Sequence, residues 1–136
     1  MNVTTEKIAD FCESLVFEDL PDEVVGRTKN LILDTIGIII RARHESESTE
    51  SLISAIRRLG MNQGACNVFG DSACYSPSAA ALINGTLAHS LDFDDTHAEA
   101  SLHASAPILP AVLAAAQLKK ASGKEILTAI ALGYEI

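Results

Sequence analysis

The sequence predicts an all-α fold, a helical bundle in which residues 1–136 form a single domain. Hydrophobic residues make up 48% of the chain and aromatic residues only 4%, so the core is expected to be aliphatic. Apolar residues recur three and four positions apart along most of the sequence, which is the spacing of one helix face. Three patterns combine a capping hydroxyl with proline or glutamate, as at helix starts; they are Ser76-Pro77, Ser105-Ala106-Pro107 and Ser122-Gly123-Lys124-Glu125.

The first half of the chain is predicted to form three helices. The second of them becomes apolar on nearly all sides beyond Leu33, so we expect it to lie deep in the fold. Asp34 is then expected to bond a neighbouring helix end, because an unpaired buried carboxylate is costly. Gly60 is expected to end the third helix in the left-handed conformation. The predicted ranges are 4–16, 21–42 and 49–59.

The second half is predicted to contain three more helices. They follow a loop over residues 61–75, which holds one short extended piece at residues 66–69. The helix over residues 77–91 is rich in alanine and contains Gly85, so a neighbouring helix can approach it closely. The last two helices are predicted over residues 105–120 and 122–136.

Composition and charge argue against several classes of protein. The net charge is −8 and the isoelectric point is near 4.8, so we expect no nucleic-acid partner, which would need a basic patch. The three cysteines have no metal-binding or redox spacing and are typical of free thiols in a reducing compartment. The longest apolar run, residues 36–40, is far shorter than the ~20 residues of a membrane span, and no secretory signal is visible. We therefore expect a cytoplasmic protein with no membrane partner.

Carboxylates and imidazoles gather between the fourth and fifth predicted helices. Three of the four histidines in the chain lie between His89 and His103, together with several carboxylates. Adjacent ionised carboxylates repel one another, and their burial costs several kcal/mol unless each is paired. Such a cluster indicates a metal site, a proton-transfer site or a solvated loop.

The spacing alone leaves three interpretations open. The first is a solvated acidic turn, with His89 as an ordinary core residue. The second is a metal site, because mixed histidine and carboxylate ligands suit several divalent metals. The third is an acid–base site in which Asp92 and His103 transfer protons and Thr96 supplies a hydroxyl group. The candidate metal ligands are His89, Asp92, Asp94, His97 and His103.

The surroundings of the cluster predict a pocket for an anionic acid. His89 and Asp92 are three residues apart, so they would share one face of a helix that continues to residue 91. Ser105 is expected to cap the next helix, and the free N–H groups there would face the same gap. Helix N-termini attract carboxylates and phosphates.

Several motifs strongly resemble the signature of the MmgE/PrpD family. One is the stretch from Asn84 to His97, which reads Asn-Gly-Thr-Leu-Ala-His-Ser-Leu-Asp-Phe-Asp-Asp-Thr-His. Others are His103-Ala104-Ser105-Ala106-Pro107-Ile108-Leu109-Pro110, Ala121-Ser122-Gly123-Lys124-Glu125 with Gly133-Tyr134-Glu135, and Leu33-Asp34-Thr35-Ile36-Gly37. The resemblance runs from about Ile8 to the last residue. In one departure, His103-Ala104-Ser105 stands where the family commonly has His-Pro-Ser.

The resemblance implies a lyase or a related isomerase. Family enzymes include 2-methylcitrate dehydratase, cis-aconitate decarboxylase and an iminodisuccinate epimerase, which act on small di- and tricarboxylic acids without a metal or organic cofactor. The positions that match Asp92, Thr96 and His103 line the active site. On this basis we predict Asp92 and His103 as catalytic residues, with Thr96, Ser105 and His89 as substrate-binding residues.

The resemblance also implies that this chain is only part of an enzyme. Family members are much longer, form homodimers and place the active site between a large helical domain and a smaller α/β domain. We therefore expect residues 1–136 to be a truncated N-terminal helical domain that is inactive alone, and to be homo-oligomeric or to lack a C-terminal half. A tricarboxylate carries about three negative charges at neutral pH. No lysine or arginine lies between Arg58 and Lys119, so the balancing cations must come from elsewhere.

An alternative from another class stays open. The short chain could be a non-catalytic helical interaction module, or the remnant of a split gene that pairs with a partner chain.

Overall fold

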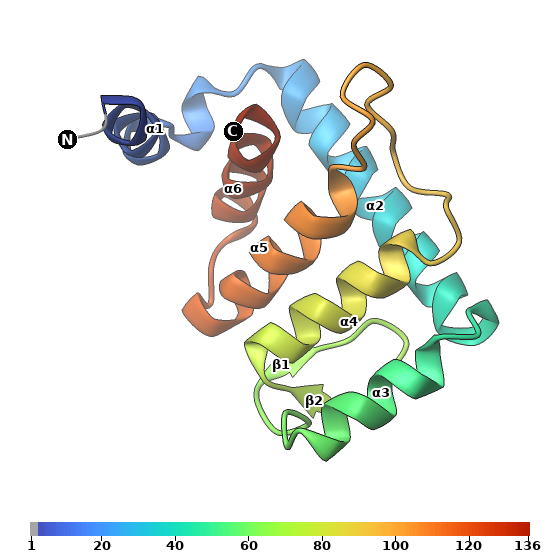
Figure 1. The fold of residues 1–136 in the computed structure, drawn as a ribbon. Coiled ribbons are helices and arrows are strands. Elements are labelled where there is room, and N and C mark those ends of the chain that lie inside the picture. The colour runs from blue at the N-terminus through green and yellow to red at the C-terminus, as the bar shows by residue number, and fades with distance from the viewer. Residues whose placement is uncertain (1–2) are drawn as a thin grey trace.

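The predicted all-α class is confirmed. The computed structural model describes residues 3–136, which form six α-helices, one short 3-10 helix and a small two-stranded hairpin (Figure 1). In chain order these are α1 (Val3–Ser14), η1 (Phe17–Asp19), α2 (Asp22–Glu45), α3 (Thr49–Arg58), β1 (Cys66–Asn67), β2 (Cys74–Tyr75), α4 (Pro77–His89), α5 (Ser105–Lys119) and α6 (Gly123–Glu135).

The central pair of the fold is α4 and α5, which pack along one another (Figure 1). The predicted close approach is confirmed at Gly85, where an added Cβ atom would lie 3.0 Å from the carbonyl oxygen of Ala106. Pro110 lies inside α5 and has no N–H group to donate to that carbonyl four residues earlier. The helix α6 approaches α5 equally closely, because a Cβ atom on Gly133 would meet Ile108 at 2.7 Å.

The hydrophobic core lies between α4, α2, α3, α5 and the hairpin. The hairpin replaces the single extended piece that the sequence predicted, with Cys66 opposite Tyr75 in an antiparallel pair. Asn84 of α4 holds the first strand, because its buried amide accepts a bond from Phe69 N–H at 3.0 Å and donates one to Asn67 O at 3.1 Å. This motif residue therefore serves packing and anchors the hairpin on α4.

The long helix α2 differs from its prediction. It extends to Glu45, and only one of its faces is buried, against α4, α5 and α6. Leu33 keeps 73% of its surface exposed and Ile40 keeps 44%. The expectation for Asp34 is wrong: it lies on the exposed side of α2, and no bond from a helix end to its carboxylate is described in residues 3–136. The apolar sequence of α2 predicted burial on nearly all sides, but the described residues bury only one side of this helix.

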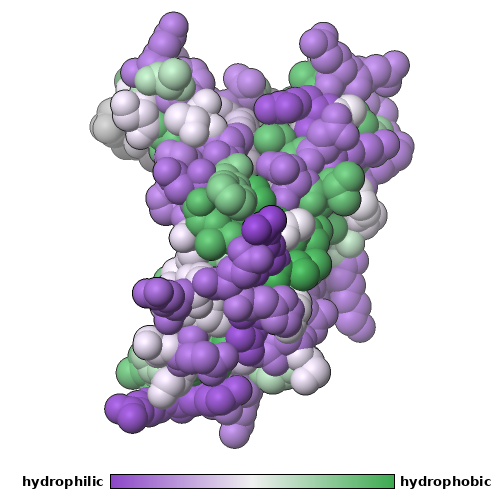
Figure 2. Space-filling view, turned by 90° about the vertical axis from the view of Figure 1, so that its right-hand side faces the viewer, coloured by the Kyte–Doolittle hydropathy of each residue, from purple (hydrophilic) through white to green (hydrophobic). Residues whose placement is uncertain are grey.

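The first helix, α1, has no buried residue in the described part of the chain. Phe11 and Ile8 on its apolar side keep 41% and 42% of their surfaces exposed. Figure 2 shows apolar side chains gathered near the middle of one face of the molecule, among hydrophilic ones. No helix among residues 3–136 is both long enough and apolar enough to cross a membrane.

We predict that this chain associates with itself in solution, because exposed apolar surface favours association. Replacing Leu33 and Ile40 together with glutamine should lower the apparent mass in light scattering and the binding of a dye for apolar surface. The melting temperature should stay close to that of the wild type, since both side chains are exposed. Ile83→Gln is the control: Ile83 is fully buried, so this change should lower the melting temperature. A wild-type chain that is monomeric at high concentration and binds no dye contradicts the prediction.

Candidate active site

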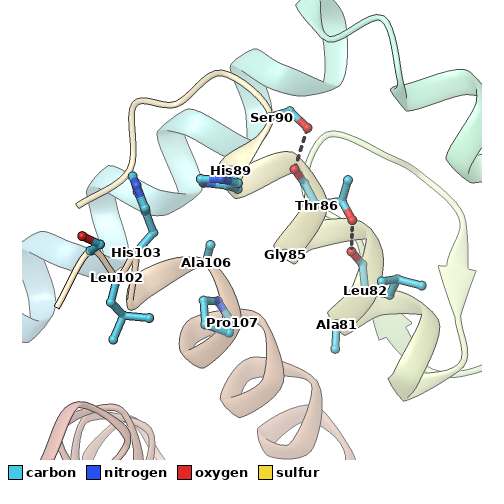
Figure 3. Close-up of a pocket in the computed structure, with 11 residues that line it drawn as sticks. Ala81, Leu82, Gly85, Thr86, His89, Ser90, Leu102, His103, Ala106 and Pro107 are labelled. Atoms are coloured by element: carbon cyan, nitrogen blue, oxygen red, sulfur yellow. Dashed lines mark hydrogen bonds between the residues drawn. The ribbon is translucent and has the colours of Figure 1, made fainter. Parts of the chain in front are cut away.

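The candidate site lies where α4 ends and α5 begins. An open cavity of about 700 Å³ is lined there by His89, Ser90 and Thr86 from the end of α4, by His103 from the following loop and by Pro107 from α5. Figure 3 shows the two imidazoles near the same end of this cavity. Their ring centroids are 4.7 Å apart in an edge-to-face arrangement. The structure therefore brings together two histidines that are fourteen residues apart in the sequence.

A buried carboxylate contacts both imidazoles. The side chain of Asp94 has no exposed surface, and both of its oxygens lie 3.1 Å from Nδ1 of His89. Nδ1 of His103 lies 3.4 Å from Oδ1 of the same carboxylate. Sequence reasoning considered Asp94 only as a possible metal ligand, because spacing does not reveal which of three nearby aspartates points inward.

Asp92 occupies a more exposed position than its neighbour Asp94. The helix α4 ends at His89, so the expectation that His89 and Asp92 share a helix face is wrong. Asp92 adopts a left-handed backbone conformation, with φ of 55°, which aspartate tolerates better than most residues. Its side chain is 82% exposed, and Oδ1 lies 3.9 Å from Nε2 of His103. The structure thus keeps Asp92 beside His103, and its catalytic role stays a prediction.

The predicted substrate-binding residues do not all line one cavity. His89 lines the cavity with His103, but Thr96 lines a second one, of about 670 Å³, between the loop, α1, α2 and α6. Ser105 lines neither and is buried, with its hydroxyl group against that of Tyr134. Their contacts with substrate stay predictions.

The N-terminus of α5 is occupied rather than open. The helix begins at Ser105, so Ser105 is its first residue and not its cap, contrary to expectation. The N–H group of Ser105 donates to Oδ1 of Asp95 at 3.0 Å, and the hydroxyl group of Tyr134 donates to Oδ2 at 3.0 Å. This carboxylate therefore takes the place that an anionic ligand was expected to take.

Burial, together with the negative charge of Asp95, raises the pKa of Tyr134 to about 12. The hydroxyl group therefore keeps its proton in neutral solution and donates it to Asp95. Through this bond Tyr134 ties α6 to the loop that carries the candidate site.

Positive charge reaches the loop from α2, far away in the sequence. Arg27 lines the second cavity together with Asp95 and Thr96. The guanidinium group of Arg41 lies 5.7 Å from the ring centroid of Phe93 in the site loop. Sequence reasoning missed both, because nothing in the local pattern of α2 indicates that it passes the loop.

Four side chains of the cluster are close enough to share a metal ion. One ligand atom from each of His89, Asp92, Asp94 and His103 lies within 4.8 Å of the others. Within residues 3–136, these four side chains are the cluster of potential metal ligands. His97 is not a member: it is exposed, and its Nδ1 accepts a bond from Ala100 N–H at 3.1 Å.

Comparison with known proteins places these residues in a family. The MmgE/PrpD N-terminal domain matches residues 6–136, and both candidate histidines fall within that range. The chain belongs to the MmgE/PrpD family. The recognition made from the sequence is thereby confirmed.

Similar curated proteins are named cis-aconitate decarboxylase or cis-aconitate decarboxylase-like protein. The cis-aconitate decarboxylase-like protein oryM of Aspergillus oryzae is 34% identical over 98% of this chain and 29% of that protein. Cis-aconitate decarboxylase of Aspergillus terreus is 34% identical over 96% of this chain and 27% of the enzyme. The human enzyme of that name is 33% identical over 97% of this chain and 28% of the enzyme. The chain thus spans less than a third of the length of these curated relatives.

We predict that the cluster binds no stoichiometric metal. Asp94 already accepts from His89, so its oxygens and that nitrogen have hydrogen-bond partners without an ion. Elemental analysis of the purified chain should find less than equimolar zinc, manganese or iron. One metal ion per chain that is lost in His89→Ala but kept in His97→Ala, the matched change outside the cluster, would contradict this prediction.

We predict a loss of stability between pH 10 and 12 that depends on Tyr134. Its pKa is 10.0 in an unfolded chain and about 12 in the folded one. The stabilising contribution is thus complete below pH 10 and is lost as the pH rises through 12. Tyr134→Phe should unfold more easily at neutral pH, by about 0.5–1.5 kcal/mol for the lost hydrogen bond. Above pH 10 its free energy of unfolding should fall less steeply than that of the wild type. Parallel curves for the two proteins in denaturant titrations across this range would contradict the assignment.

Proposed function

We propose that residues 1–136 form the N-terminal part of the helical domain of a cofactor-free lyase, or a related isomerase, acting on a small di- or tricarboxylic acid. Cis-aconitate is a candidate substrate because the similar proteins are named for its decarboxylation. 2-Methylcitrate is a second candidate because the family resemblance includes its dehydratase. The observation that carries the proposal is the pair of imidazoles, His89 and His103, which share the Asp94 carboxylate at the wall of a cavity in a MmgE/PrpD domain.

The proposed chemistry is proton transfer by His103. An imidazole changes its protonation state near neutral pH, so it can remove a proton beside a carboxylate or protonate a carbanion left by loss of carbon dioxide. Its Nε2 atom lies on the side of Asp92, the second proposed proton-transfer group. His89 lines the same cavity, where it is proposed to bind the substrate. Thr96 and Ser105 are proposed to contact substrate once the remaining wall of the site is present.

The charge of the substrate requires groups beyond the first cavity. Neither lysine nor arginine lines it, and Asp92 would repel an anion by about 1 kcal/mol at 4 Å even in water. Arg27 and Arg41 approach the loop from α2 and are proposed to supply part of the positive charge that offsets the carboxylates of the substrate. The proposed enzyme takes the rest of its cations from chain beyond the segment that matches residues 1–136, which is less than a third of each relative. We propose a cytoplasmic homodimer as its working state.

A non-catalytic interaction module is the second candidate. The exposed apolar side of α1, with Phe11 and Ile8, favours it, because such a face suits a partner helix. Activity measurements separate the two candidates.

We predict that the isolated chain releases no carbon dioxide from cis-aconitate and no water from 2-methylcitrate. Losing one preorganised charge-stabilising donor already costs ~100-fold or more in rate. Residues 1–136 match less than a third of each relative, so we expect them to supply only part of the charge-stabilising groups. Coupled assays of the purified chain measure this directly. Turnover at rates typical of enzymes contradicts the proposal that the site is incomplete.

We predict activity when residues 1–136 replace the matching segment of the Aspergillus terreus cis-aconitate decarboxylase, which is 34% identical. In this chimera, His103→Ala should lower kcat by ~100-fold or more, since a general acid–base residue is lost. His97→Ala, a change of the same kind outside the cluster, should leave kcat near that of the parent chimera. A folded chimera without activity, or one in which His103→Ala has no effect, counts against the enzyme and favours the interaction module.

A further inference from the structure

We infer that Asp94 is the positioning residue of the site and that it holds both imidazoles, His89 and His103, with a proton on Nδ1 and with Nε2 free for chemistry. This inference deepens the proposed function and rests on it for its catalytic meaning. It adds a residue that the family resemblance did not single out, and it gives His89, proposed above to bind the substrate, a further role in proton transfer beside His103.

The first step is the burial of the carboxylate. The Asp94 side chain is fully enclosed, although it lies in a loop between an exposed residue, Phe93, and a half-buried one, Asp95. A buried carboxylate needs donors, because an unpaired one costs several kcal/mol. Among the described residues, the cationic side chains paired with it are the two histidines, and His89 makes the hydrogen bond.

The second step is the direction of the hydrogen bonds. An ionised carboxylate only accepts, so Nδ1 of His89, 3.1 Å from both oxygens, must carry the proton it donates. Nδ1 of His103 is buried and makes no hydrogen bond among the described residues, but it lies 3.4 Å from Oδ1 of Asp94, close enough for a small movement to form one. A buried N–H group needs an acceptor, so the same carboxylate sets the tautomer of both rings.

The third step is the accessibility of the two imidazole rings. With Nδ1 protonated, each neutral ring offers the lone pair of Nε2 as a base, and after protonation it offers an acid there. His89 is more than half exposed and His103 is 28% exposed, so both rings stay accessible from the cavity. Two rings 4.7 Å apart that share one carboxylate allow one to accept a proton while the other donates. Asp94 would stabilise whichever ring is charged, as the aspartate of a catalytic triad does.

Asp92 provides a matched comparison two residues away. It is also an aspartate beside His103, but its side chain is 82% exposed and faces Nε2 rather than Nδ1. Removal of its charge should therefore leave both tautomers unchanged. The two aspartates thus separate the effect of a nearby charge from the effect of a buried acceptor.

The test is nitrogen NMR of the histidine side chains in the isolated chain, in alkaline buffer where imidazole is neutral. In the wild type, both His89 and His103 should show a protonated Nδ1 and an unprotonated Nε2. Asp94→Asn keeps the size of the side chain but offers one acceptor and a competing donor, so at least one ring should shift to the opposite tautomer. Asp92→Asn should show the wild-type pattern. Circular dichroism checks that each variant is folded.

The wild-type spectrum decides the inference even if Asp94→Asn fails to fold. A protonated Nε2 on either ring of the wild type overturns it, and so does a folded Asp94→Asn protein with unchanged tautomers. None of these readouts depends on turnover, so they stand apart from the test of the proposed function. In an active chimera, Asp94→Asn should lower kcat by at least about 10-fold with little change in KM. An unchanged kcat there would overturn the catalytic meaning of Asp94 while leaving its tautomer role intact.

Discussion

The close contact between α4 and α5 decides where the parts of the candidate site lie. Gly85 lets the two helices approach until the backbone of one nearly touches the other, and no larger residue fits there without moving Ala106. Because α4 ends at His89 and α5 begins at Ser105, this contact brings the end of one helix to the start of the next. The two candidate histidines meet as a result, although neither belongs to a common helix face.

Two adjacent carboxylates in the loop between α4 and α5 contact different partners. Asp94 points into the fold and meets the imidazoles, whereas Asp95 meets the first N–H group of α5 and the hydroxyl group of Tyr134. Successive side chains of an irregular segment can face different sides, so neither aspartate competes with the other for donors. Each negative charge is tolerated in the fold because polar groups of its own stabilise it.

The helices were predictable because their signals are local. The capping box of Ser122 and Glu125 and the start at Ser76 and Pro77 appear as the sequence indicated, and each depends on neighbouring residues only. The inward turn of Asp94 was not predictable, because it follows from the left-handed backbone of Asp92 and from contacts across the loop. The approach of Arg27 to the loop depends on the packing of α2, which no local spacing encodes. Family motifs therefore pointed to the candidate site, whereas its buried carboxylate could be identified only from the three-dimensional structure.

The short path between α4 and α5 also bears on how the chain folds. Contacts between helices that are near in sequence lose little chain entropy on closing, and loops of about ten residues close in roughly 10–100 ns. The hairpin instead reaches α5 across a long separation, through bonds such as Asn67 to Gln117 at 2.8 Å. The hairpin also bonds α4 at Asn84 over a short separation. We therefore expect α4 to form an early folding unit with α5 and the hairpin, and the bond between the hairpin and α5 to form later. On this order, the two histidines come together before much of the surrounding core has assembled.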